Sequence, residues 1–158
     1  MTYYDSIADG YDELHKEEQL NKLRIIKENL GDVGSSLLDV GCGTGFSLDL
    51  FNVEKKIGLD PSKELLKYCK HQTICASAES IPFPDNSFDT VICVTAVHNF
   101  DDMAKGLSEI RRVAKRSVAI SVLRKSEKFD DIQREVRRLF KVDKELNERF
   151  DRIFFCST

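Results

Sequence analysis

The stretch Leu37-Leu38-Asp39-Val40-Gly41-Cys42-Gly43-Thr44-Gly45 decides the fold of this chain. The apolar run over residues 36–40 is typical of a buried strand, and it opens into three alternate glycines ahead of a predicted short helix over 46–51. Glycines between a strand and a helix let the backbone turn tightly and approach a ligand closely. The stretch therefore predicts a ligand-binding loop at the end of a strand.

The spacing of the glycines indicates which ligands suit this loop. Gly41, Gly43 and Gly45 follow a G-x-G-x-G pattern, whereas G-x-G-x-x-G is the pattern that holds a dinucleotide pyrophosphate. This spacing, and the lack of a second domain for a substrate, disfavour a nicotinamide oxidoreductase. A P-loop is excluded because its lysine is absent. Asp39 would repel a pyrophosphate but suits a ligand that carries an ammonium or sulfonium cation.

A second acidic residue, Asp60, lies at the end of the next predicted strand, about 20 residues beyond the first glycine. A carboxylate at that distance can accept hydrogen bonds from both hydroxyls of a ribose. The structural alternative is an aspartate that caps the helix beginning at Pro61 and Ser62. Its distance from the glycine loop favours the ribose.

Strand and helix patterns alternate along the rest of the chain. The predicted strands cover 36–40, 56–60, 73–76, 88–95 and 118–123, and the predicted helices cover 15–30, 46–51, 61–69, 101–115 and the segment marked by Ile132, Val136 and Phe140. Such alternation with right-handed crossovers predicts an α/β fold, with a Rossmann-like, doubly wound and mostly parallel sheet.

Three segments in order resemble the class I S-adenosylmethionine-dependent methyltransferases. They are residues 37–45, residues 58–60, which read Gly-Leu-Asp, and residues 78–89, which read Ala-Glu-Ser-Ile-Pro-Phe-Pro-Asp-Asn-Ser-Phe-Asp. Residues 4–12 are similar to the leading helix of the UbiE-like, type 11 subgroup. The resemblance covers residues 3 to about 123. It implies S-adenosyl-L-methionine as the cofactor, with no metal, and leaves the methyl acceptor undefined.

The resemblance also implies a role for each matching residue. The implied contacts are Asp39, Gly41, Cys42 and Gly43 with the methionine part, Asp60 with the ribose, Pro61 and Ser62 near the adenine, and Ser77, Ala78 and Glu79 along the adenine edge. Val94, Thr95 and Ala96 would face the methionine and the transferred methyl, and Tyr11 would close over the cofactor. Ser77 stands where the family often has an acid, so this contact is expected to be weaker or made by the backbone.

The C-terminal part departs from the family pattern, which closes the sheet with two strands after the fifth. Here only Ile153-Phe154-Phe155 reads as a strand, which predicts a sheet truncated after the fifth strand. We expect residues 152–157 to pair antiparallel with the fifth strand and to place Phe154 and Phe155 on opposite faces. A free edge there would favour a homodimer or a partner subunit, and a monomer with a covered edge is the alternative. The expected organisation is one methyltransferase domain over 1–158, with a helical cap (1–30), a cofactor-binding core (35–123) and a C-terminal helix and strand (124–158).

Two further features have open interpretations. His98 follows the fourth predicted strand, where a neutral imidazole could act as a general base or could simply orient the loop. The basic residues Arg111, Arg112, Lys115 and Arg116 suit a solvated helix end, with an anionic substrate or RNA as the alternative.

Composition sets the outer limits. The chain has 158 residues and a net charge of −3, so nothing in it demands a nucleic-acid or membrane partner. The N-terminus lacks the pattern of a secretory signal, and the five cysteines have no CxxC pair, so we expect buried, reduced thiols in a cytoplasmic protein.

The sequence therefore predicts a methyltransferase (EC 2.1.1.-) that transfers a methyl group from S-adenosyl-L-methionine to an acceptor, a small molecule in preference. A non-catalytic or partner-dependent subunit, and a tRNA or protein methyltransferase, stay open as alternatives.

Overall fold

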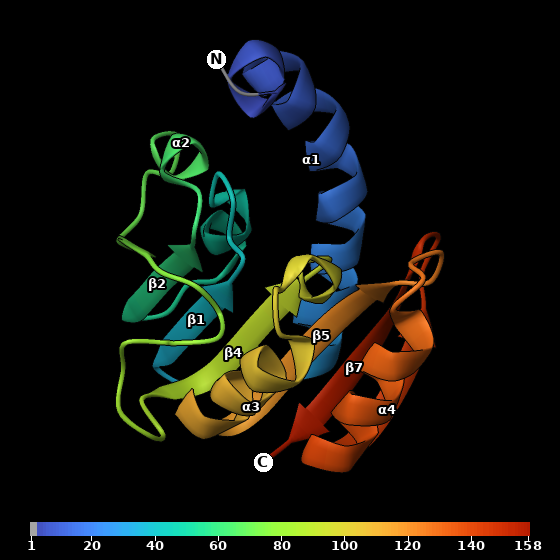
Figure 1. Ribbon diagram of the computed structural model, residues 1–158. Helices are drawn as coiled ribbons and strands as arrows, with labels where there is room; N and C mark the ends of the chain where they lie inside the picture. Colours follow the sequence, from blue (N-terminus) through green and yellow to red (C-terminus); the bar gives the residue numbers. More distant parts are fainter. Residues whose placement is uncertain (1–2) are drawn as a thin grey trace.

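The computed structural model describes the backbone of residues 3–158 and the side chains of residues 16–158. Within that part, seven strands form one sheet in the order β3-β2-β1-β4-β5-β7-β6 (Figure 1). The strands are β1 (Ser36–Val40), β2 (Lys55–Asp60), β3 (Thr73–Cys75), β4 (Phe88–Val94), β5 (Ala114–Leu123), β6 (Lys141–Asn147) and β7 (Asp151–Ser157). The first five pair in parallel, so the predicted Rossmann-like, mostly parallel sheet is confirmed.

Helices cover both faces of this sheet. They are α1 (Tyr3–Leu30), α2 (Lys63–Leu66), α3 (Met103–Val113) and α4 (Phe129–Leu139), with the short 3-10 helices η1 (Phe46–Leu50) and η2 (Val97–Asn99). In Figure 1, α3 and α4 lie in front of the sheet and the C-terminal half of α1 lies behind it. Leu107 of α3 and Ile132 of α4 belong to one buried cluster, and Leu23 of α1 belongs to the other. Because neighbouring strand residues point to opposite faces, Leu38 joins the first cluster and Leu37 the second.

The C-terminal strands confirm one prediction and correct another. β7 pairs antiparallel with β5, in a register that sets Phe154 opposite Ile120, as expected for residues 152–157. Phe154 and Phe155 are buried in the two different clusters, on opposite faces. The predicted truncation is wrong, because β6 pairs antiparallel with β7 and forms the edge of the sheet. The free edge expected beside β7 therefore does not exist.

Smaller corrections concern element ends. α1 begins at Tyr3 instead of residue 15, and β5 begins at Ala114 and takes over the end of the helix predicted for 101–115. None of the helices within residues 3–158 has the length and apolarity needed to cross a membrane.

The basic run at the end of α3 has internal partners. Arg112 donates to Glu109 Oε2 at 2.6 Å and to Asp85 Oδ1 at 3.0 Å, and Arg116 lies 3.5 Å from Asp89. These contacts support the structural interpretation of the run.

All five thiols are free, and three of them are buried. The expectation of burial is wrong for Cys75, which is exposed on the short edge strand β3.

Candidate cofactor site

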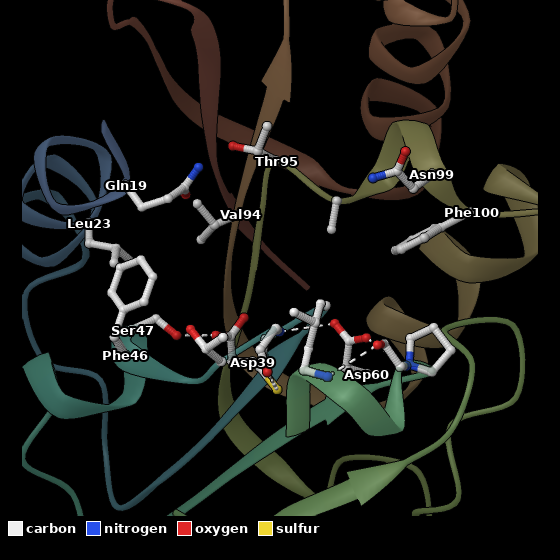
Figure 2. Close-up of a pocket in the computed structure, with 18 residues that line it drawn as sticks. Gln19, Leu23, Asp39, Phe46, Ser47, Asp60, Val94, Thr95, Asn99 and Phe100 are labelled. Atoms are coloured by element: carbon white, nitrogen blue, oxygen red, sulfur yellow. Dashed lines mark hydrogen bonds between the residues drawn. The ribbon is translucent and has the colours of Figure 1, made fainter. Parts of the chain in front are cut away.

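A cavity of about 320 Å³ opens at the carboxyl ends of β1, β2 and β4, where ligands bind in sheets of this kind (Figure 2). The predicted residues that line it are Asp39, Gly41, Cys42, Gly43, Asp60, Pro61, Ser62, Val94 and Thr95. Ala96, predicted beside Val94 and Thr95, also lines it, and the lining residues that were not predicted are Gln19, Leu23, Thr44, Phe46, Ser47, Leu65, Asn99 and Phe100. The sequence therefore indicated one wall of the cavity and missed most of the other.

The glycine loop needs its glycines for two different reasons. Gly41 has a φ of +80°, which favours glycine. A Cβ there would lie 2.5 Å from Cβ of Ala96 on the opposite wall, so there is also no space for a side chain. Gly43 has a φ of +56°, and a Cβ there would lie 4.0 Å from Cδ1 of Leu65, an ordinary van der Waals distance. Because Gly43 has no side chain, a ligand can approach the backbone of the loop closely at this position.

Asp60 ties the two halves of this wall together. Its Oδ2 accepts from the Gly43 amide at 3.0 Å, and its Oδ1 accepts from the Ser62 amide at 2.9 Å. Ser62 Oγ in turn accepts from the Leu65 amide at 3.2 Å and caps α2. Each carboxylate oxygen has a second lone pair, so the geometry also leaves acceptors for a pair of ribose hydroxyls. The capping and ribose interpretations of Asp60 are therefore compatible.

Asp39 is a buried acid aimed at the same cavity. Ser47 Oγ donates to its Oδ2, whereas its Oδ1 has no hydrogen-bond partner among the described residues. Burial raises the pKa of Asp39 to about 7; the Ser47 hydrogen bond opposes that rise, and the charge of Asp60 adds to it. An orphaned buried carboxylate oxygen fits the ammonium of a methionine moiety, which would supply the missing donor.

This pKa leads to a pH prediction. As the pH falls through about 7, the Asp39 carboxyl becomes protonated in the free protein and can no longer pair with an ammonium, so cofactor affinity should fall with pH. We expect the Kd of S-adenosylhomocysteine to rise about 20-fold between pH 7.5 and pH 5.5, measured by calorimetry. Asp39→Asn should bind weakly and show a nearly flat profile. An unchanged slope in that variant would assign the pH dependence to another group.

The opposite wall is built around a strained residue, Thr95. Its φ of +52° is unusual for a β-branched side chain, and such strain persists only where the surroundings hold it. The Thr95 amide donates to the carbonyl of Ser121 at 3.0 Å and to Ser121 Oγ at 2.9 Å. Its Oγ1 donates to Asp151 Oδ2 at 2.6 Å and accepts from Lys22 Nζ at 3.1 Å. Partners on three elements, α1, β5 and β7, therefore fix the shape of this wall.

Lys22 and Asp151 form a buried ion pair behind Thr95. Lys22 Nζ lies 3.4 Å from Asp151 Oδ1, and the exposed fractions of the two side chains are 3% and 0%. Neither residue was predicted from the sequence. The available signal was helical spacing, which places Lys22 on the same face of α1 as Gln19 and the buried Ile26.

Other predicted residues lie outside the lining of this cavity. Ser77 and Ala78 do not contact it, and Glu79 Oε2 accepts from the amides of Asp101 and Asp102 at 3.1 and 3.2 Å. The adenine-edge roles of Ser77, Ala78 and Glu79 stay predictions. Tyr11 falls in α1, but its side chain is outside the described residues.

His98 lies in η2 beside the lining residue Asn99. Its Nδ1 is buried and has no hydrogen-bond partner among the described residues. Burial lowers the pKa of His98, which keeps the ring neutral at pH 7, and the charge of Asp151 opposes this effect. The proposed general-base role stays a prediction.

Comparison with known proteins gives the family. Residues 38–122 match the family model described as a methyltransferase domain. The chain belongs to this family. It is 30% identical over 135 residues to the ubiquinone/menaquinone biosynthesis C-methyltransferase UbiE of Rickettsia bellii, covering 71% of this chain and 54% of UbiE. The class I, type 11 resemblance seen in the sequence is confirmed, and S-adenosylmethionine is the cofactor of the domain.

Two other matches bear on the extent of the chain. The protein MJ1252 of Methanocaldococcus jannaschii is 37% identical over 119 residues, which cover 72% of this chain and 46% of that protein. The chain thus spans about half the length of the curated relatives. In the solved complex between the Haloferax volcanii Trm112 methyltransferase activator and a methyltransferase, one chain matches with a TM-score of 0.82 at 15% identity. The match covers 100% of this chain and 98% of that one, and it shows a common fold.

Proposed function

We propose that this domain transfers the methyl group of S-adenosylmethionine to a small-molecule acceptor. The observation that carries the proposal is the pair Asp39 and Asp60, which end adjacent parallel strands and face one cavity beside the glycine loop. One carboxylate suits the cation of the methionine part, and the other suits the ribose. The position of both at the carboxyl edge of the sheet agrees with the family.

The protein's part in the reaction is alignment. The bound cofactor supplies an activated sulfonium methyl for an in-line displacement. Asp39 and Asp60 would hold the two ends of the cofactor, while the fixed Thr95 wall would orient the acceptor and help exclude water. Neutral His98 would accept a proton from an acceptor hydroxyl or amine. We also propose that Ser77, Ala78 and Glu79 contact the edge of the adenine and that Tyr11 closes over the cofactor. We further propose a cytoplasmic location, which the five free thiols support.

Binding and turnover can be tested in sequence. Calorimetry should show S-adenosylhomocysteine binding and NAD failing to bind. Release of S-adenosylhomocysteine from S-adenosylmethionine should then depend on one member of a panel of small hydroxyl, amine and thiol compounds. As a matched control, Asp85→Asn, in the loop before the amino end of β4, should leave both measurements unchanged. Binding of NAD in place of S-adenosylhomocysteine would overturn the proposal.

A partner-dependent methyltransferase is the second candidate, favoured by the full-length match to the Haloferax complex. Such a domain would bind S-adenosylhomocysteine with normal affinity but release none from S-adenosylmethionine with any acceptor when alone. Light scattering during the same experiments would show whether the active species is a monomer, a homodimer or a heteromer. Turnover by a pure monomer would contradict this candidate.

A further inference from the structure

Four basic side chains gather beside the Thr95 wall of the cavity. Arg124, Lys125 and Lys128 follow the carboxyl end of β5, and Arg149 lies in the turn between β6 and β7. All four are exposed. We call this group the acceptor rim. Figure 1 shows the two segments meeting where β5 ends and β7 begins.

Hydrogen bonds connect the rim to the cavity wall. Lys128 Nζ donates to the carbonyl of His98 at 3.2 Å, and His98 precedes the lining residue Asn99. Arg124 Nη2 donates to the carbonyls of Glu148 and Arg149, at 2.8 Å each. Two residues beyond Arg149, Asp151 accepts from Thr95 Oγ1. The rim is therefore held against the wall that we assign to the acceptor.

The rim cations have no carboxylate partners. Arg112, Arg116, Arg134, Arg137 and Arg138 all form ion pairs elsewhere on the chain. None of the four rim side chains forms an ion pair with a described carboxylate. The neighbouring Glu148 is buried and turned inward, with Oε1 accepting from the amides of Phe150 and Asp151 at 2.7 Å each. Glu127 is the exposed acid within the segment, so the rim retains a positive field.

The rim also carries an aromatic ring. The Arg149 guanidinium lies 5.0 Å from the centroid of the Phe150 ring, and Phe150 is half-buried. Together they present a flat, positively charged surface next to the wall. A phosphate or carboxylate is the group that a cluster of arginine and lysine recognises best.

We propose that the acceptor rim binds the phosphate or carboxylate of the methyl acceptor, which is therefore a small anionic molecule. The inference rests on the proposed function, and it narrows the substrate class. A small anion fits better than RNA because the basic patch is short and is followed directly by the exposed acids Asp130 and Asp131 on α4, whereas RNA needs a longer basic track. The charge of the rim opposes the net charge of the chain, which would concentrate anions at this edge of the sheet.

The test uses protein saturated with S-adenosylhomocysteine, so that the cofactor cavity is filled. Pyrophosphate is titrated by calorimetry at fixed salt, with a single-stranded RNA of about 12 nucleotides as the second probe. We expect pyrophosphate to bind and the Arg124→Gln/Lys128→Gln variant to weaken it at least tenfold. The second variant, Lys125→Gln/Arg149→Gln, removes two rim charges but no hydrogen bond to the turn. It should show the same loss of pyrophosphate affinity, and it keeps the test valid if the first variant misfolds.

The matched control is Arg111→Gln/Lys115→Gln, two exposed cations at the opposite end of the sheet, which should leave pyrophosphate affinity unchanged. No pyrophosphate binding, or equal losses in rim and control variants, would overturn the proposal. RNA binding that depends on the rim and exceeds pyrophosphate binding by 100-fold would also overturn it. The affinity for S-adenosylhomocysteine should stay within twofold of wild type in every rim variant. If the wild type fails to bind it, the proposed function fails separately.

Discussion

Asp151→Ala is expected to lower the free energy of unfolding by about 3–5 kcal/mol, the usual cost of removing one member of a buried ion pair. The substitution would leave the Lys22 ammonium buried with no counter-charge and would remove the acceptor of the Thr95 hydroxyl. Urea denaturation of the purified domain would measure the change. Because this cluster lies beneath the Thr95 wall, the wall should also lose its fixed shape.

Two further variants separate the ion pair from general damage. In Lys22→Met/Asp151→Ala the uncompensated charge is gone, so the double variant should recover about 2 kcal/mol of the loss. Asp131→Ala breaks the exposed pair with Arg134 and should cost less than about 1 kcal/mol. A double variant as unstable as Asp151→Ala alone would show that Lys22 has no part in the effect.

The wall around the glycine loop could be predicted because its determinants are local. Asp39, the glycines and Asp60 each lie at the junction of a buried strand and the next element, and short apolar runs mark those strands clearly. In a parallel sheet the carboxyl ends of neighbouring strands share one edge, so spacing along the chain translates directly into proximity. The residues of this wall accordingly line one cavity.

The sequence did not predict β6 because this strand lies at the edge of the sheet. As an edge strand it pairs only with β7, and Lys141, Asp143, Lys144 and Glu145 are exposed. The resulting run of charged residues is typical of a loop in sequence. Charged side chains on an edge strand nevertheless protect it from pairing with strands of other chains. Its apolar signal is reduced to the half-buried Val142 and Leu146.

The residues that hold the opposite wall could not be predicted, for a different reason. Thr95 was expected at the site, but its partners Lys22 and Asp151 come from α1 and from the start of β7, and no spacing rule connects residues so far apart in the chain. Neither a lysine on an apolar helix face nor an aspartate ahead of an apolar strand predicts an ion pair by itself. Only the tertiary arrangement shows that they neutralise each other.

Asp60→Ala is expected to weaken the binding of S-adenosylhomocysteine by about 10- to 150-fold, which corresponds to about 1.5–3 kcal/mol for lost hydrogen bonds to a charged acceptor. The variant removes the acceptors proposed for the ribose, and it also frees the Gly43 and Ser62 amides that Asp60 now holds. Calorimetry would measure the change, and Asp49→Ala, an exposed acid outside this cavity, serves as the control.

The two effects of Asp60→Ala can be separated with a ligand that lacks one ribose hydroxyl. The wild type should bind 2′-deoxy-S-adenosylhomocysteine about 10-fold more weakly than the parent compound, because one hydrogen bond to the carboxylate is lost. In Asp60→Ala the two ligands should bind equally, since neither finds the acceptor, whereas a purely structural role in holding Gly43 and Ser62 would leave the difference between the ligands intact. Equal binding of both ligands by the wild type would mean that Asp60 shapes the loop without touching the ribose.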